Sequence, residues 1–124
     1  MRAYLCDDVP SLRTLVRSLF EEDPAVVVVG EAGEAPTAIR EIAALQPDVV
    51  LLDLSMPGMD GLEALPHIRD AAPDVCVIVF SGFTVERMAG IARAHGAHHY
   101  VTKGEELESL RELVRDCKST SLAA

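Results

Sequence analysis

The stretch VVLLDLSMPGMDG, residues 49–61, decides the fold and raises a question of chemistry. Its four consecutive aliphatic residues are typical of a strand buried on both faces of a parallel sheet. Asp53 stands where that strand should end, and Pro57, Gly58 and Gly61 then favour a turn. A buried strand that ends on a carboxylate directs this charge out of the core, toward a candidate ligand site at the end of the strand.

Two hydrophobic periodicities alternate along the rest of the chain. Apolar residues at helical spacing indicate helices over about 12–19, 35–43, 85–94 and 107–117, and a further helix is expected to start near Gly61. Short apolar runs indicate strands at 3–6, 26–30, 48–53, 75–80 and 98–102. Five strands alternating with five helices predict an α/β fold, with a parallel sheet covered on both faces and right-handed crossovers.

The helix after residue 60 carries a conflict between two local rules. Asp60 and Glu63 have the spacing of a capping box, which places a helix start near Gly61. Pro66 then falls inside the helix, where it removes a backbone donor. We expect a kink or a delayed start in this helix.

Length and charge limit the classes of function. The chain has 124 residues, which fits one domain, and a formal net charge of −9. An acidic surface argues against direct nucleic-acid binding and is compatible with a cation site or a basic partner. The N-terminus lacks the apolar region of a signal peptide, and no run reaches about 18 apolar residues, so no membrane span is indicated.

The cysteines and histidines favour structural roles. Cys6, Cys76 and Cys117 are widely spaced and odd in number, which predicts separate buried thiols, no disulfide and a reducing cytosol. His98 and His99 should point to opposite faces of their strand. We expect no cysteine or carboxylate near the histidines, and therefore no transition-metal site.

Polar residues follow four of the five predicted strands. Asp7 and Asp8 come after the first, Asp53 after the third, Ser81 after the fourth and Lys103 after the fifth. In a parallel sheet these residues share one edge, and ligands of open α/β sheets bind beyond the carboxyl ends of the strands.

This set of residue types indicates chemistry on a phosphorylated species. Three crowded carboxylates repel one another, and a hard cation such as Mg²⁺, which prefers oxygen ligands and recruits phosphate oxygens, relieves that repulsion. Lys103 supplies a positive charge for an anion, and Ser81 supplies a hydroxyl donor. Asp53 is the candidate nucleophile, because an aspartate can form an aspartyl-phosphate.

Each of these residues also has a simpler interpretation when taken alone. An acidic pair after a strand is often a helix cap, an isolated lysine is usually solvated, and a serine after a strand is often a turn residue. The functional interpretation depends on the whole set lying together.

In this combination the chain resembles the receiver domain of two-component response regulators. The matching motifs are LCDDVP, LLDLSMPGMDG, VFSG and GAHHYVTK, in this order over about residues 1–117. The resemblance implies a flavodoxin-like, three-layer α/β/α fold with strand order 2-1-3-4-5. It implies a receiver domain at 1–117, and we expect residues 118–124 to form a flexible tail.

The resemblance also assigns roles at the metal site. It implies that Asp53 is the phospho-acceptor and that Mg²⁺ is the cofactor. Asp8 would be a direct metal ligand together with Asp53, and Asp7 would act through bound water. Ser55, two residues past the nucleophile, would give its backbone carbonyl to the metal.

Further roles concern the response to phosphorylation. Lys103 would pair with Asp53 or with the phosphoryl group, and Ser81 would hydrogen-bond a phosphoryl oxygen. Movement of the 81–84 loop would let Tyr100 rotate inward and change the surface formed by 85–94, 98–102 and the last helix. Phe83 would shield the acyl phosphate from water. Gly104 departs from many receivers, which have proline after the lysine.

The implied function is a cytoplasmic signalling switch rather than an enzyme. A sensor histidine kinase or a phosphotransfer protein would donate the phosphoryl group, and an output domain or partner would read the changed surface, as a monomer or a phosphorylation-dependent dimer.

Three alternatives are a phosphatase, a nucleotide or flavin carrier, and a receiver-like module that works without phosphorylation. Ser55 in place of a second catalytic acid disfavours the first. The lack of a phosphate cradle in DDVPS disfavours the second, and the intact acidic and lysine positions disfavour the third.

Overall fold

A computed structural model gives the fold and describes residues 1–83, 85–104 and 108–123. Five strands form one sheet in the order β2-β1-β3-β4-β5, and every neighbouring pair is parallel. The strands are β1 (Arg2–Cys6), β2 (Val27–Ala32), β3 (Val49–Leu52), β4 (Cys76–Ser81) and β5 (His99–Thr102). The predicted strand order is therefore confirmed.

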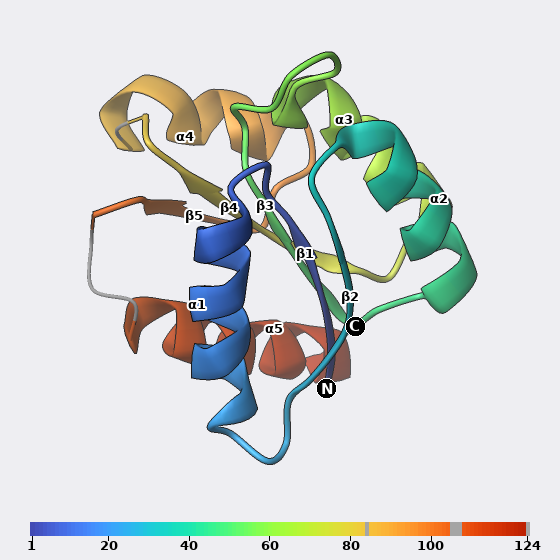
Figure 1. The fold of residues 1–124 in the computed structure, drawn as a ribbon, viewed down its shortest axis with the longest axis vertical. Helices are drawn as coiled ribbons and strands as arrows, with labels where there is room; N and C mark the ends of the chain where they lie inside the picture. Colours follow the sequence, from blue (N-terminus) through green and yellow to red (C-terminus); the bar gives the residue numbers. More distant parts are fainter. Residues whose placement is uncertain (84, 105–107, 124) are drawn as a thin grey trace.

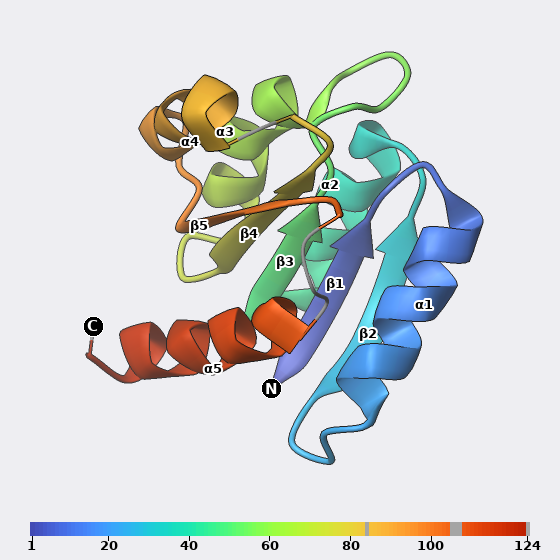
Figure 2. The same cartoon turned by 90° about the vertical axis from the view of Figure 1, so that its left-hand side faces the viewer.

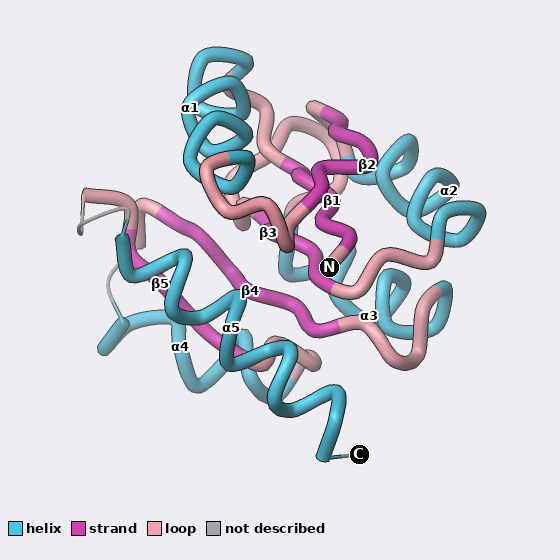
Figure 3. Tube along the Cα trace, turned by 90° about the horizontal axis from the view of Figure 1, so that it is seen from below, coloured by secondary structure: helices cyan, strands magenta, loops and turns pink. Residues whose placement is uncertain are grey.

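Helices cover both faces of this sheet. They are α1 (Pro10–Glu21), α2 (Ala35–Leu45), α3 (Gly61–Ala71), α4 (Val85–Ala94) and α5 (Glu108–Ala123). Figure 1 shows the alternation of strands and helices along the chain, and Figure 2 shows α1 and α5 in front of the sheet. The view from below in Figure 3 shows α2 and α3 on the other side of it. The result is the expected three-layer arrangement.

The sheet divides the hydrophobic core into two clusters because successive side chains of a strand point to opposite faces. On one face, Tyr4 of β1 packs in a cluster with residues of α2, α3 and α4. On the other face, the next residue, Leu5, packs with Phe20 of α1 and Leu110 of α5. The central strands β1 and β3 are thereby buried from both sides, which fixes the position of the loops that follow them.

Helix α3 begins where the capping box predicts, and Pro66 does not delay it. The side chain of Asp60 accepts a hydrogen bond from the backbone N–H of Glu63 at 2.8 Å. Pro66 lies inside the helix. The expected delayed start is wrong because the Asp60 cap stabilises the first turn, whose backbone donors lie upstream of the proline.

The last helix is longer than the sequence indicates. Helix α5 continues to Ala123, through most of the segment expected to be a tail. The division into a domain at 1–117 and a flexible tail at 118–124 stays a prediction. Leu107, expected in the apolar stripe of this helix, lies outside the described residues. Within the described part of the chain, no helix has the length and apolar character needed to cross a membrane.

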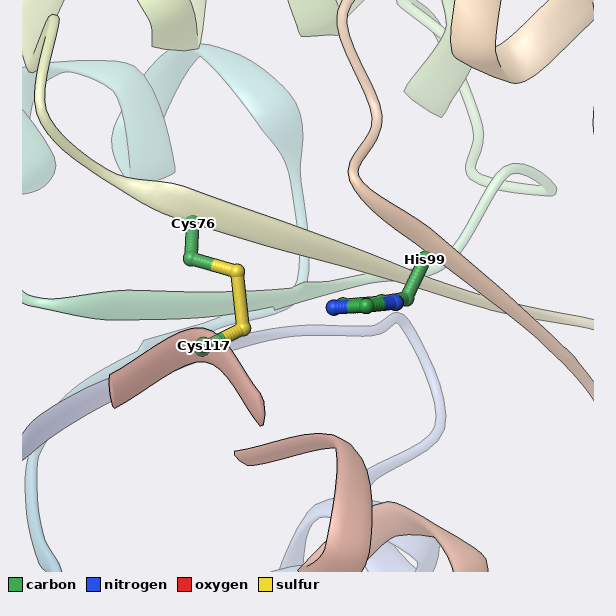
Figure 4. Close-up of side chains that lie close together, drawn as sticks. All are labelled: Cys76, His99 and Cys117. Carbon is green, nitrogen blue, oxygen red and sulfur yellow. A yellow bond between two sulfur atoms is a disulfide. The ribbon is translucent and has the colours of Figure 1, made fainter. Parts of the chain in front are cut away.

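The cysteine prediction is wrong in one respect. All three cysteines are buried, as expected, but Cys76 and Cys117 form a disulfide, and only Cys6 is free. Figure 4 shows this bond with the imidazole of His99 beside it. The two cysteines are 41 residues apart in sequence, and only the packing of α5 onto β4 brings them together. The cysteine count therefore does not argue for a reducing compartment, and the expectation of no cysteine near the histidines is also wrong.

Candidate functional site

The candidate site lies at the carboxyl ends of the two central strands. Asp53 directly follows β3, and its backbone N–H donates to the carbonyl of Cys6, the last residue of β1, at 2.9 Å. The start of α3 packs onto the same backbone. A Cβ added to Gly61 would lie 2.2 Å from the carbonyl oxygen of Asp53, so only glycine permits this approach. The position of Asp53 is thus fixed by β1 on one side and α3 on the other.

Three carboxylates gather at this edge. Oxygen atoms of Asp7, Asp8 and Asp53 all lie within 4.8 Å of one another. The helix-cap interpretation of the acidic pair is wrong, because the N-cap of α1 is Val9, which makes no side-chain capping bond. Instead, Asp7 accepts a hydrogen bond from the N–H of Val9 at 2.9 Å. That bond uses Oδ1 of Asp7, while its Oδ2 faces the ammonium of Lys103.

Lys103 reaches this cluster from the end of β5. Its ammonium lies 3.0 Å from a carboxylate oxygen of Asp7 and 3.2 Å from one of Asp53. Burial lowers the pKa of Lys103, but the two carboxylates outweigh burial and hold the pKa above its ordinary value. Lys103 therefore stays charged and lies between Asp7 and Asp53, as the predicted pairing with Asp53 requires.

The environment of Asp53 disfavours its own negative charge. The side chain is 2% exposed, and this burial is the main reason that its pKa rises from 3.8 to about 6. Asp7 raises the pKa further. A hydrogen bond from the N–H of Ser55, 3.0 Å from a carboxylate oxygen of Asp53, and the charge of Lys103 oppose the increase. The charged form of Asp53 is therefore disfavoured, and additional positive charge in the pocket would stabilise it.

The remaining predicted residues surround the pocket without all touching it. Ser81 is fully buried at the end of β4, and its hydroxyl accepts from the N–H of Phe83 at 3.2 Å. Among the described contacts, that hydroxyl makes no hydrogen bond to Asp53. Tyr100 is half-buried, and its hydroxyl donates to the carbonyl of Phe83 at 2.7 Å. Thr84, in the loop expected to move, lies outside the described residues.

The donor set fits a divalent cation. Three carboxylates within 4.8 Å offer the hard oxygen ligands that Mg²⁺ prefers, and burial, with the charge of Asp7 added to it, raises the pKa of Asp53. Asp7, Asp8 and Asp53 are the residues that could hold such an ion. Ser55 is exposed and lies beside the pocket, and the role of its carbonyl stays a prediction.

Two supporting residues were not singled out from the sequence. Arg13 of α1 donates to the backbone carbonyl of Asp7, which holds the acidic loop against the helix. Cys6 lies directly below the carboxylates, with its Sγ 3.5 Å from Sδ of Met56. Burial, and then the charges of Asp53 and Asp7, raise the pKa of Cys6 to about 12, so the floor of the pocket stays neutral. The position of Cys6 just before the acidic pair was the only available sequence signal.

Comparison with known proteins agrees with this geometry. The family model described as the response regulator receiver domain matches residues 3–115. The chain belongs to this family. Receiver domains are phospho-acceptor modules of two-component systems, and the flavodoxin-like fold predicted from the resemblance is confirmed for this receiver domain.

Similar proteins attach receiver domains to different outputs. The nitrate/nitrite response regulator protein NarL of Escherichia coli is 42% identical over 106 residues, covering 86% of this chain and 49% of that protein. A protein-glutamate methylesterase/protein-glutamine glutaminase of Koribacter versatilis is 39% identical, covering 89% of this chain and 31% of that protein. This receiver domain thus spans about half or less of the length of these relatives.

A solved structure shows the same fold. The crystal structure of a two-component response regulator of the LuxR family from Aurantimonas is 34% identical and superposes with a TM-score of 0.85, covering 98% of this receiver domain and 85% of that chain. The three-layer arrangement around the acidic edge is therefore the shared framework of the family.

Proposed function

We propose that this receiver domain is a signalling switch that accepts a phosphoryl group on Asp53. The observation that carries the proposal is the ammonium of Lys103 held between Asp7 and Asp53, at 3.0 and 3.2 Å, inside a cluster of three carboxylates. A buried nucleophile, an acidic cation site and a fixed positive charge together suit a phosphoryl group, whose oxygens need positive partners.

The proposed reaction is a transfer from a phosphohistidine. An oxygen of the Asp53 carboxylate attacks phosphorus, an oxygen–phosphorus bond forms, and the phosphorus–nitrogen bond of the donor breaks. The imidazole leaves with the electron pair of that bond and takes up a proton. Lys103 then pairs with phosphoryl oxygens in place of the Asp53 carboxylate, and the hydroxyl of Ser81 donates to another of them.

The pocket is proposed to bind Mg²⁺ for this reaction. Asp8 and Asp53 would hold the ion directly, Asp7 would hold it through water, and Ser55 would offer its backbone carbonyl. The bound ion supplies positive charge that offsets the charge of the phosphoryl oxygens. The part of the protein itself is to aim the Asp53 oxygen at that position and to keep Lys103 beside it.

Phosphorylation is proposed to change the surface formed by α4, β5 and α5. A phosphoryl group adds about −1.5 to −2 charges and strong acceptor oxygens, which draw Ser81 toward the pocket. This movement competes with the bond from the N–H of Phe83 to the Ser81 hydroxyl. Because the Tyr100 hydroxyl is bonded to the carbonyl of Phe83, any shift of Phe83 is passed to Tyr100. Two arrangements of close energy are required, and phosphorylation shifts their balance.

Chemical-shift mapping with a phosphoryl mimic and Mg²⁺ tests this coupling. We expect shift changes at Tyr100 and along α4 and α5 in addition to the pocket. A Tyr100→Phe variant lacks the hydroxyl bonded to Phe83 and should lose the distant changes while keeping those at Asp53. Changes that stay within the pocket of the unmodified protein would rule the coupling out.

The partners and the compartment follow from this role. The receiver domain would act in the cytoplasm, where a sensor histidine kinase or a phosphotransfer protein would donate the phosphoryl group. An output domain or a separate protein would bind the α4–β5–α5 surface. The chemistry proposed for the receiver domain itself is limited to its own phosphorylation and slow dephosphorylation. Phosphorylation-dependent dimerisation through the same surface is compatible with this role.

Intact mass spectrometry tests the phospho-acceptor. Incubation with acetyl phosphate and Mg²⁺ should add one phosphoryl group, and chelation of the metal should prevent the addition. The Asp53→Asn variant should stay unmodified, whereas Asp74→Asn, which changes an exposed aspartate at the opposite end of the sheet, should be modified normally. Modification of Asp53→Asn at the normal rate would disprove the assignment.

A further inference from the structure

A covalent bond ties the last helix to the sheet on the face opposite Tyr100. Cys76 is the first residue of β4, and Cys117 lies in the second half of α5. Their Cα atoms are 5.7 Å apart, which is an ordinary separation for disulfide-bonded cysteines. The two thiols are therefore brought together by the fold itself, through the packing of Cys76 and Cys117 in the cluster under α1 and α5.

The surroundings of the pair combine burial with one polar neighbour. Cys76 is 5% exposed and Cys117 is 1% exposed. The side chain of His99 belongs to the same group, with ligand atoms of all three residues within 4.8 Å, and Figure 4 shows its ring beside the two sulfur atoms. His99 extends from β5, so three elements meet at this point.

The packing of α5 is looser one helical turn away. A hollow of about 220 Å³ lies between this helix and the segments that begin β1 and β2. Val114 and Arg115 form its α5 side. Cys117 is three residues beyond Val114, so the hollow lies next to the helical turn that carries the disulfide, although neither cysteine lines it.

A disulfide here is at odds with the proposed cytoplasmic location. Cytosolic thiols are kept reduced, and the disulfides found there are usually transient and catalytic or redox-sensing. A permanent disulfide would need an oxidising compartment, where phosphoryl transfer from a cytoplasmic kinase would not occur. A bond that opens and closes removes this conflict.

We propose that Cys76 and Cys117 form a reversible thiol–disulfide site through which small-molecule disulfides clamp α5 onto β4. One thiol loses its proton to the His99 imidazole, and the thiolate attacks a sulfur of the small disulfide, releasing one small thiolate. The second cysteine thiolate then attacks the mixed disulfide, the Cys76–Cys117 bond forms, and the second small thiolate leaves. Both leaving thiolates take up the protons lost by the cysteines. An excess of small thiol reverses both steps.

Closing the bond restricts one element of the proposed output surface. Helix α5 contributes to the α4–β5–α5 surface, and a covalent link near its end limits how far it moves when Tyr100 changes position. Oxidation would therefore weaken the conformational response to phosphorylation without touching the Asp53 pocket at the far end of the strands. This consequence rests on the proposed function, and the reversibility of the bond rests on the cytoplasmic location proposed with it, but the thiol titration below is read without any phosphorylation.

Counting free thiols over a redox titration tests the site. The protein is equilibrated at increasing ratios of oxidised to reduced glutathione, unfolded in acid, alkylated and weighed. We expect three alkylated cysteines at the reducing end, one at the oxidising end, and a midpoint inside the range of ratios found in cytosol. A Cys6→Ser variant should still lose two thiols without gaining mass from glutathione, whereas Cys117→Ser should lose at most one, as a mixed disulfide that carries the mass of glutathione. A pair that stays oxidised or stays reduced over that whole range would overturn the proposal.

Two further measurements separate the alternatives. Native mass spectrometry of the reduced protein with Zn²⁺ should show no ion retained by Cys76, His99 and Cys117. A single zinc that is lost in His99→Ala would instead make the cluster a metal site and overturn the redox assignment.

Acetyl phosphate treatment of both redox forms should add the same phosphoryl group, with smaller chemical-shift changes at α5 in the oxidised form. Failure of phosphorylation in both forms would refute the proposed function and leave the thiol titration as the independent result.

Discussion

Asp53 is held at a cost to the stability of the folded protein. Its pKa is raised from 3.8 to about 6, mainly by burial and then by the charge of Asp7. Between about pH 4 and about pH 6 the folded state therefore binds more protons than the unfolded state, so the free energy of unfolding falls as the pH rises through this interval. The charge that the proposed phosphoryl transfer requires on Asp53 is the same charge that the fold disfavours.

The Asp53→Asn variant should consequently be more stable than the unmodified protein at pH 7. A shift of about two pKa units corresponds to about 1–3 kcal/mol of unfolding free energy once the lost pairing with Lys103 is allowed for. Urea denaturation without Mg²⁺ should show this gain at pH 7 and little difference below about pH 3, where Asp53 is protonated in both states. A gain that is the same at both pH values would contradict the assigned cause.

Phe83 should control the lifetime of the phosphorylated state. Its ring is 39% exposed and lies beneath the guanidinium of Arg87, 5.9 Å from the ring centre, at the loop that follows Ser81. We expect an apolar ring there to exclude the water that would hydrolyse the acyl phosphate. A Phe83→Glu variant, which offers a carboxylate to orient that water, should lose its phosphoryl group severalfold faster in a time course followed by intact mass. Phe83→Leu is the matched control and should decay at nearly the normal rate.

Helix α3 requires glycine at its first residue, Gly61. Gly61 approaches the backbone of Asp53 and Leu54 so closely that an added Cβ would lie 2.2 Å from one atom and 2.7 Å from another. By contrast, Gly90 in α4 has no atom within 4 Å of an added Cβ. The first glycine positions the backbone of Asp53, whereas the second only weakens its helix.

The same substitution should therefore have opposite effects at these two glycines. Gly61→Ala should lower the free energy of unfolding by about 1–3 kcal/mol through overpacking, and it should slow phosphorylation by acetyl phosphate because Asp53 is displaced. Gly90→Ala should raise the free energy of unfolding by about 0.5–1 kcal/mol, because alanine favours the helix, and leave the phosphorylation rate unchanged. Urea titration and the mass assay measure both. Equal effects of the two substitutions would show that the close approach of Gly61 to Asp53 does not require glycine.

The sequence was most informative where one element carried two consistent signals. The buried run before Asp53 and the turn residues after it predicted both the strand and the exit of the carboxylate. The Asp60–Glu63 spacing located the start of α3 although Pro66 suggested otherwise. The disulfide could not be found in this way, because nothing local to Cys76 or Cys117 relates the two residues. Their proximity is a property of how α5 crosses the sheet, which periodicity does not encode.

For the whole molecule, the disulfide acts over a long stretch of chain. It links residues 41 apart in sequence and so restricts the unfolded ensemble. A loop of this length predicts that the bond contributes about 2–4 kcal/mol to the free energy of unfolding. Urea denaturation with and without a strong reductant should show this difference, and it should vanish in Cys117→Ser. Equal stability of the oxidised and reduced proteins would mean that the reduced chain keeps the same restriction by packing alone.

Strand β5 is four residues long, and its side chains alternate between the two faces of the sheet. His99 meets the sulfur atoms under α5, while Tyr100 packs into the cluster on the opposite face. Inserting or deleting one residue ahead of this strand would exchange the two layers, sending the phenol toward the cysteines and the imidazole away from them. We therefore expect natural variants to differ here by substitution and not by insertion or deletion. The same alternation along β5 places His99 beside the cysteines and Tyr100 on the face that is coupled to phosphorylation.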